Sequence, residues 1–242
     1  FTDAGAHTVY YRAAATGHSD VTGYFAVVID RLDISKAQIV LGEALTYNGQ
    51  SQIQGIASVA VDGLNVTYNP SGDTGKDAGD YALTVTGTGN FTGTASKDYT
   101  IAKAKLTGVS AAQSGKLTYN GAAQTAAVTA AATTVDGTQA AFTYSDKENG
   151  TYSDTVPAFT KAGDYTVYYK AEAANHEDVT GSLTVTVGKR DIADAEITLG
   201  GSLTYNGAEQ TQSIESVTVD DMTVTYDVTG DTGTDAKTYT MT

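Results

Sequence analysis

The chain has 242 residues, a net charge of −14 and neither Cys nor Trp. Without Cys there is no disulfide, thiol nucleophile or zinc–thiolate site, and the few scattered Lys and Arg form no basic patch for a nucleic acid. No apolar run approaches the roughly 18 residues of a membrane span. Thr, Val, Tyr, Ala and Gly dominate, and this composition of strand and turn formers predicts an all-β fold.

Self-similarity divides the chain into repeats. The string LTYNG occurs three times, at intervals of 72 and 86 residues, beginning at Leu45, Leu117 and Leu203. Two gap-free matches, each with an offset of 158 residues, relate residues 1–23 to 159–181 and residues 66–84 to 224–242. A short-type and a long-type repeat therefore alternate, and their summed period is 158 residues.

The repeat boundaries predict an elongated array of tandem Ig-like antiparallel β-sandwich domains. In chain order we expect the C-terminal part of a long-type repeat, a complete short-type repeat, a complete long-type repeat and a truncated short-type repeat, at residues 1–34, 35–103, 104–189 and 190–242. Because the outer two segments hold only part of a repeat, we expect the array to continue on both sides.

Within each repeat, polar and apolar residues alternate with the period of two that marks a strand with one buried face. Such faces are formed by Tyr81, Leu83 and Val85, by Tyr165, Val167 and Tyr169, and by Leu183, Val185 and Val187. Turn-forming pairs separate the strands, at Asn48-Gly49, Asp62-Gly63, Ser71-Gly72, Ala78-Gly79, Asn120-Gly121, Asp136-Gly137, Asn149-Gly150 and Asn206-Gly207. Short strands at this spacing indicate a sandwich of about seven strands per repeat.

The sequence Ala-Gly-Asp-Tyr ends at Tyr81 and again at Tyr165. It resembles a tyrosine corner, in which the hydroxyl of a Tyr near the start of a late strand binds a nearby backbone group. The equivalent positions in the outer segments hold His7 and Tyr239. We interpret the motif as a feature of the fold and not as a site.

The junctions between repeats contain no Gly/Ser-rich or Pro-rich tether, as residues 28–34, 99–106 and 185–192 show. The last strand of one repeat is therefore expected to run almost directly into the first strand of the next. Such a junction limits bending, which predicts a stiff rod of repeats.

Together these motifs resemble MBG-type and related bacterial Ig-like repeats of large surface proteins in Firmicutes and other gut bacteria. The resemblance rests on the LTYNG openings, the Ala-Gly-Asp-Tyr strand, the Thr-Tyr-Ser stretch at residues 151–153, the Val-Thr-Gly turn at residues 179–181, and a Gln after each opening at Gln52, Gln124 and Gln210. It covers essentially the whole chain. It implies secretion, a stalk or adhesin role outside the cell or at the cell surface, and neither catalysis nor a cofactor.

No residue set predicts a catalytic, cofactor-binding or metal-binding site. The histidines, which are His7, His18 and His176, are expected to be partly exposed polar loop residues. Two acidic loops could offer oxygen ligands to calcium, but their spacing is not that of an EF-hand and Lys76 lies inside one of them, so ordinary turns are favoured. Their carboxylates belong to Asp73, Asp77, Asp80, Asp231 and Asp235.

Three further patterns have an ordinary structural explanation. Donors for a Lys–Asn isopeptide bond would be Lys105, Lys116, Lys161 and Lys189, but no Lys, Asn and acid recur together in both copies; Asp3 occupies the position equivalent to Lys161. The pairs Tyr10-Tyr11 and Tyr168-Tyr169 each place one ring outward, where it could stack on a sugar, although packing across strands is favoured. Sequons at Asn65, Asn90 and Asn149 carry little weight in a bacterial protein.

The leading hypothesis is a non-catalytic stalk or fibre segment of an adhesin-like bacterial protein at the cell surface or outside the cell. Its partners would be neighbouring repeats of the same chain, identical chains in a fibre, or a host or bacterial surface glycan or protein, with no nucleic acid and no membrane insertion. Two alternatives stay open: a carbohydrate- or protein-binding Ig-like module, and a subunit of an extracellular filament assembled through strand exchange.

Overall fold

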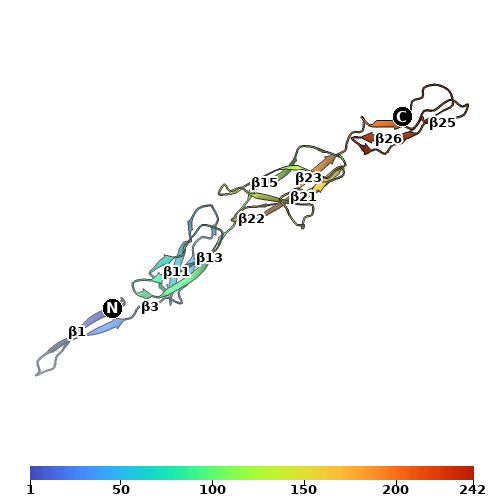
Figure 1. The fold of residues 1–242 in the computed structure, drawn as a ribbon. Helices are drawn as coiled ribbons and strands as arrows, with labels where there is room; N and C mark the ends of the chain where they lie inside the picture. The colour runs from blue at the N-terminus through green and yellow to red at the C-terminus, as the bar shows by residue number, and fades with distance from the viewer. The chain divides into compact units, whose positions relative to one another are not determined.

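A computed structural model describes residues 1–242 as an all-β protein, which confirms the predicted class (Figure 1). Its elements are strands β1 to β28, and it contains no apolar helix that could span a bilayer. The chain divides into two compact units. The first comprises residues 1–109, 131–141 and 171–179, and the second comprises residues 110–130, 142–170 and 180–242.

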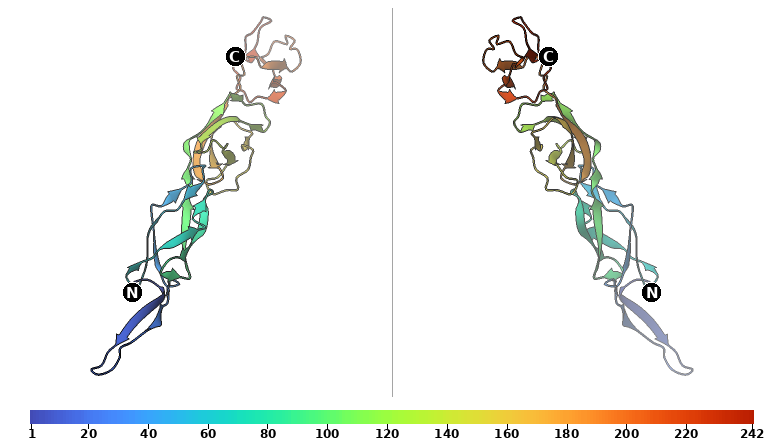
Figure 2. Two further views of the ribbon diagram at one scale, coloured as in Figure 1. Left: turned by 90° about the vertical axis from the view of Figure 1, so that its left-hand side faces the viewer. Right: turned by 90° about the vertical axis from the view of Figure 1, so that its right-hand side faces the viewer.

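The first unit begins with a two-stranded antiparallel hairpin, drawn in blue in Figure 2. Strands β1 (Gly5–Ala13) and β2 (Val21–Ile29) pair along their whole length. No third strand joins this sheet, and the large side chains of Tyr10, Tyr24 and Phe25 are consequently exposed.

The segment predicted as a complete short-type repeat forms two main sheets in the first unit. One has the order β5-β13-β11-β9, with bounds Leu45–Thr46, Thr94–Ala102, Gly79–Gly87 and Tyr68–Ser71. The other has the order β4-β7-β8, with bounds Gln38–Leu41, Ile56–Val61 and Leu64–Asn65. Short ladders pair β6 (Gln52–Ile53) with β10 (Thr74–Gly75), and β3 (Leu32–Asp33) with β12 (Phe91–Thr92).

One hydrophobic core joins these sheets. Its buried side chains include Ile39 and Val59 from the three-stranded sheet and Leu83, Val85 and Ile101 from the four-stranded sheet. Along β11 burial alternates as the period of two predicts, because Leu83 and Val85 are fully buried and their neighbours are not. Two sheets that share one core make a sandwich-like arrangement.

A short ladder of the first unit pairs β14 (Ala104–Lys105) in parallel with β22 (His176–Glu177). Only Lys103 separates β13 from β14. The expectation that one strand runs almost directly into the next is therefore confirmed at this position.

The second unit contains most strands of the segment predicted as a complete long-type repeat. A four-stranded sheet has the order β16-β23-β21-β19, with bounds Leu117–Thr118, Val179–Gly188, Gly163–Glu172 and Ala141–Ser145. Two-stranded sheets pair β15 (Thr107–Ser114) with β18 (Ala127–Thr133), and β17 (Gln124–Thr125) with β20 (Ala158–Phe159). Val167 and Val185 are fully buried, as their alternating pattern predicts.

The last segment of the second unit has two small sheets. One has the order β24-β26-β27, with bounds Glu196–Leu199, Ile214–Val219 and Met222–Thr223, and the other pairs β25 (Gln210–Thr211) with β28 (Thr232–Gly233). Residues 234–242 contain no strand.

The tyrosine corner forms where the sequence predicts it. The hydroxyls of Tyr81 and Tyr165 each donate to the carbonyl oxygen four residues earlier, at 2.9 and 2.8 Å. In the equivalent position, His7 Nε2 lies 2.8 Å from the carbonyl oxygen four residues before it. The Tyr239 hydroxyl accepts from the backbone N–H of Asp235 at 2.9 Å. All four copies therefore tie this side chain to the same place in the preceding loop.

The three LTYNG turns also share one geometry. The side-chain oxygen of each turn Asn accepts from the N–H two residues later, at 2.9, 3.0 and 3.0 Å, in Asn48, Asn120 and Asn206. The following Gln donates to the Thr carbonyl oxygen six residues earlier, at 3.1, 2.9 and 2.9 Å, in Gln52, Gln124 and Gln210. The recurring Gln thus closes a local turn.

Candidate functional site

The three histidines have different environments. His7 is half-buried and His18 is exposed, but His176 is fully buried, so the expectation of a partly exposed loop residue is wrong for His176. The reason is its place in the fold. β22 begins at His176 and pairs with β14, the strand that enters the long-type repeat. In the short-type repeat β12 likewise begins at Phe91 and pairs with the entering strand β3. His176 therefore closes one end of a core.

Both ring nitrogens of His176 are occupied. The backbone N–H of Val135 donates to Nε2 at 3.2 Å, so this nitrogen carries no proton. Nδ1 then carries the proton and donates to the carbonyl oxygen of Ala174 at 2.7 Å. A neutral imidazole with two bonded nitrogens offers neither a free metal ligand nor a general base, and its role is to hold Val135 in place.

The acidic stretch from Asp73 to Asp80, which ends in the first residues of β11, does not gather its carboxylates. Asp77 accepts from Asn175 Nδ2 at 3.0 Å, Asp80 accepts from the Thr100 hydroxyl at 2.6 Å, and Asp73 bonds through its backbone carbonyl. In the second copy of the loop, backbone groups are bonded at Asp231 and Asp235. No group of three His, Asp or Glu in the structure is arranged to hold a metal ion.

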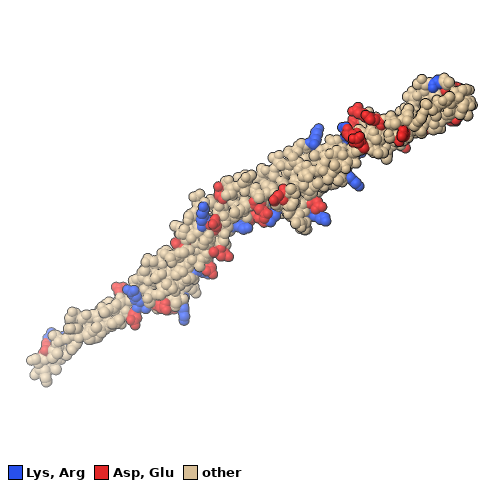
Figure 3. Space-filling model, in the orientation of Figure 1, with Lys and Arg blue, Asp and Glu red and all other residues tan.

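The lysines considered for isopeptide bonds are all exposed; they are Lys105, Lys116, Lys161 and Lys189. On the face drawn in Figure 3, Lys and Arg side chains lie singly among Asp and Glu side chains. The exposure of these lysines does not identify a covalent crosslink.

The tyrosine pairs pack across strands. Tyr169 is buried with its ring over Gly181, and Tyr168 is half-buried. Tyr11 covers Gly23, its partner in the β1–β2 register, in the same way. The favoured explanation of cross-strand packing is thus confirmed for one ring of each pair.

Two junctions within the first unit share an arrangement that the sequence did not predict. At the first, Asn90 Oδ1 accepts from the Ala4 N–H at 2.8 Å, and Asn90 Nδ2 donates to the Asp3 carboxylate at 3.1 Å. The backbone carbonyl of Asn90 accepts from the Leu32 N–H at 2.9 Å. One residue therefore holds the preceding segment with its side chain and the entering strand with its backbone.

The second junction repeats these bonds. Asn175 Oδ1 accepts from the Ala78 N–H at 3.0 Å, Asn175 Nδ2 donates to the Asp77 carboxylate, and the Asn175 carbonyl accepts from the Ala104 N–H at 3.0 Å. At both junctions the side-chain amide binds an Asp-Ala pair that precedes a long strand. We call this arrangement the Asn clamp; its members are Asn90 with Asp3-Ala4 and Asn175 with Asp77-Ala78.

A further contact strengthens the second junction. The buried Tyr47 donates its hydroxyl to Asp136 Oδ2 at 2.7 Å, and its ring meets His176 edge-on with centroids 5.5 Å apart. This hydrogen bond lowers the pKa of Asp136 well below its ordinary 3.8 and raises the pKa of Tyr47 above 10.0. Gly49 also lies close, since a Cβ there would be 2.8 Å from Asp136 Cβ.

The Asn clamp was not predicted from the sequence because its partners are 86 to 98 residues apart. A signal for it existed nevertheless. Both repeat types carry Asp-Ala-Gly, at residues 3–5 and 77–79, and both carry an Asn directly before the position of Phe91 or His176. Shared residues in otherwise different repeat types point to a contact between repeats.

No protein-family model matches the chain, and no curated protein is significantly similar to it. The geometry must therefore carry the functional argument. It combines polar contacts that recur at the two junctions, a buried imidazole at His176 and a close backbone approach at Gly49.

Proposed function

We propose that this chain is a non-catalytic structural segment, a series of Ig-like repeats that serves as a stalk or fibre in a secreted or surface-exposed bacterial protein. The observation that carries the proposal is the Asn clamp, which recurs at two successive junctions. A stalk needs resistance to bending between its repeats, and a junction held at several separate points supplies it.

The second junction has three such points. The Asn clamp and the bond between Tyr47 and Asp136 lie next to each other, because the Asn175 side chain and Asp77 both act on the Tyr47 hydroxyl. Lys103 alone links the two strands covalently. Each exposed polar contact is weak alone, but the short link holds the contacts together and makes their loss cooperative.

Spin labels can test this junction cleanly because the chain has no Cys. Ser58→Cys and Gln139→Cys place labels at exposed sites on either side of it. We expect a narrow distance distribution that broadens when Tyr47→Phe and Asn175→Ala are combined. A broad distribution in the doubly labelled chain without these changes would contradict the proposal.

A matched control makes the same two kinds of substitution away from the junction. Tyr152→Phe with Asn149→Ala removes a hydroxyl that donates to the Glu148 carbonyl oxygen, and it should leave the distance distribution narrow. Small-angle scattering of the whole chain provides an independent measurement. A rod-like profile supports the structural role, and the profile of a flexible coil would count against it.

A second candidate function is a carbohydrate- or protein-binding module. The observation in its favour is the pair of exposed rings at Tyr10 and Tyr24, whose centroids are 6.0 Å apart. Such rings can stack on the apolar face of a sugar. A glycan-array screen tests it: a specific signal that Tyr10→Ala abolishes supports binding, and an empty array argues against a sugar ligand.

A further inference from the structure

The complete long-type repeat has an open groove of about 540 Å³ beside its four-stranded sheet. One side is formed by Tyr168 of β21 and by Thr180, Gly181 and Ser182 of β23, and the other by the turn at residues 148–152. A volume of this size lies within the roughly 300–1,000 Å³ of small-ligand pockets. We call this site the long-repeat groove.

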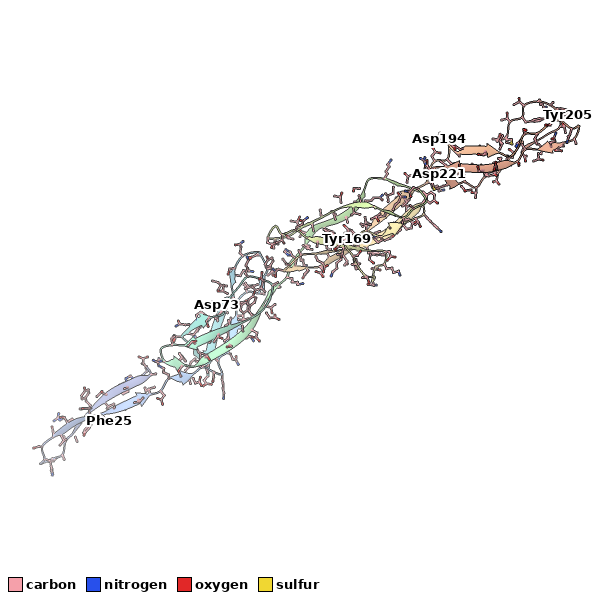
Figure 4. All side chains as sticks on the ribbon, in the orientation of Figure 1. Phe25, Asp73, Tyr169, Asp194, Tyr205 and Asp221 are labelled. Carbon is pink, nitrogen blue, oxygen red and sulfur yellow. The ribbon has the colours of Figure 1, made fainter.

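The long-repeat groove lies on the outer face of the sheet. Burial alternates along both strands, because Tyr169 and Leu183 are buried whereas Tyr168 and Ser182 are not. The side chain of Tyr169, which Figure 4 labels, occupies the inner side of Gly181, where a Cβ would clash with its ring. Since neighbouring side chains of a strand point to opposite faces, Tyr168 and Ser182 point outward.

The turn beside the groove is an addition of the long-type repeat. Tyr144 and Ala162 are 18 residues apart, whereas their equivalents in the short-type repeat, Tyr68 and Ala78, are 10 residues apart. Two backbone hydrogen bonds between Tyr144 and Ser153, of 2.7 and 2.9 Å, close the additional residues into a loop. The side of the groove that this loop forms is therefore specific to the long-type repeat.

The turn is held by its own hydrogen bonds. The Gly150 N–H donates to the Lys147 carbonyl oxygen at 3.1 Å, and the Tyr152 hydroxyl donates to the Glu148 carbonyl oxygen at 3.0 Å. These bonds use backbone groups and one hydroxyl, so the Glu148 carboxylate and the Asn149 amide, both exposed, remain available to a ligand. A turn that is already shaped costs little further ordering on binding.

The groups around the groove suit a sugar. The half-buried Tyr168 offers an aromatic ring on which the apolar C–H face of a sugar can stack. The Thr180 and Ser182 hydroxyls, the Glu148 carboxylate and the Asn149 amide can donate to or accept from sugar hydroxyls. An acidic sugar would meet both the Glu148 carboxylate and a chain of net charge −14, so a neutral sugar is favoured.

A peptide strand fits the groove less well. Tyr168 lies on the face of β21, and β21 lies between β23 and β19 in the sheet order, so a ligand there contacts side chains and not a strand edge. Addition of a peptide as a further strand needs an edge with unpaired backbone groups. A compact ligand with several hydroxyls is therefore the better match.

The strand side of the groove recurs in the other long-type segment. By the offset of 158 residues, its equivalents are Tyr10, Thr22 and Gly23. Three of the four strand residues are thus the same in both copies, and only Ser182 differs, since Tyr24 takes its place. The ring position is kept although it faces outward.

We propose that the long-repeat groove binds a neutral sugar unit of a glycan. Tyr168 stacks on the C–H face of the sugar ring, and Glu148 and Asn149 bond to its hydroxyls. The inference rests on the second candidate function, sugar binding, and gives it a site in the complete long-type repeat. It uses no junction contact, so the structural role is judged separately by the spin-label measurement.

A glycan array tests the class of ligand. The whole chain, labelled with a dye at its N-terminus, is applied to neutral, sialylated and uronic-acid-containing oligosaccharides. We expect signals on neutral oligosaccharides, and calorimetric titration with the strongest of them should give one site per chain, because the turn at residues 148–152 occurs once. An array without a specific signal, or with signals on acidic oligosaccharides only, would overturn the proposal.

Matched variants locate the binding. Tyr168→Ala should weaken it about tenfold, whereas Tyr168→Phe keeps the ring and should bind nearly as well as the parent chain. Glu148→Ala changes an exposed turn residue, leaves the core intact and should also weaken binding about tenfold. Its control is Glu196→Ala, at an exposed acid in β24, which should have no effect.

Two outcomes would contradict the assigned groove. One is an equal effect of the two Glu variants. The other is a signal that Tyr10→Ala abolishes and Tyr168→Ala leaves intact, which would support sugar binding at Tyr10 and Tyr24 and refute it at the long-repeat groove.

Discussion

Replacing Gly75 by Ala would press a methyl group against two side chains of the core. The added Cβ would lie 2.8 Å from Tyr81 Cζ and 2.9 Å from Ile101 Cδ1, whereas carbon atoms pack best at about 3.5–4.0 Å. Neither neighbour can retreat easily, because the Tyr81 hydroxyl is bonded to the preceding loop and Ile101 is fully enclosed. Overpacking of this kind costs about 1–3 kcal/mol, so we expect a loss of about 2 kcal/mol.

For a cooperative domain of about 60–100 residues, a loss of about 2 kcal/mol in the free energy of unfolding corresponds to a fall in Tm of roughly 10 °C. Urea unfolding followed by far-UV circular dichroism measures the free energy, and hydrogen exchange in residues 79–102 locates it. Gly55→Ala is the matched control, since a Cβ there meets no atom within 4 Å, and its effect should stay within about 0.5 kcal/mol.

A second substitution tests the cause. Adding Tyr81→Leu to Gly75→Ala removes part of the clash, so the pair should be less destabilising than the sum of the single changes by about 1 kcal/mol. If Gly75→Ala unfolds at the same urea concentration as Gly55→Ala, the packing argument is refuted.

Three other predictions concern the corner, the core and the junction. Tyr165→Phe removes the corner hydrogen bond and should lower the free energy of unfolding by about 1 kcal/mol, whereas Tyr10→Phe, at an exposed ring, should have no measurable effect in the same urea titration. Leu83→Ala leaves a cavity at a fully buried position and should cost about 3 kcal/mol; a loss below about 1 kcal/mol would mean that the core there is loosely packed. Because the pKa of Asp136 is lowered on folding, its bond with Tyr47 is fully stabilising above the ordinary pKa of 3.8 and is lost as the pH falls through the folded-state pKa. The spin-label distribution should accordingly broaden in acid, and Asp136→Asn should show a smaller pH-dependent change.

Sequence patterns predicted the features whose partners are close in the chain. The corner hydrogen bonds join residues four apart, and the Gln of each LTYNG turn bonds a carbonyl six residues earlier, so a short motif contains the whole interaction. Burial along β11 followed from its alternation, because side chains of a strand point to opposite faces. Short sequence patterns therefore sufficed to predict the strands, the turns and the tyrosine corners.

The same patterns could not predict the contacts at the junctions between repeats. The Asn clamp joins an amide to an Asp-Ala pair 86 to 98 residues away, which is at least a full repeat, and the residues next to Asn90 or Asn175 do not by themselves identify that partner. Burial of His176 was missed for a related reason: a polar residue in a loop is usually exposed, and only the place of this loop over the end of a core reverses that. Both features depend on tertiary placement.

The division of the Asn clamp between neighbours has a consequence for how such a gene can change. Each repeat type has a copy with the Asn, at Asn90 and Asn175, and a copy with the Asp-Ala pair, at residues 3–4 and 77–78, although Gly17 replaces the Asn in the first long-type segment. In the complete long-type copy Lys161 replaces the Asp, but the backbone N–H of Ala162 keeps one of the two donor–acceptor pairings chemically possible. A change in the number of repeats therefore keeps the whole clamp only where a copy that has the Asn follows a copy that has the Asp-Ala pair.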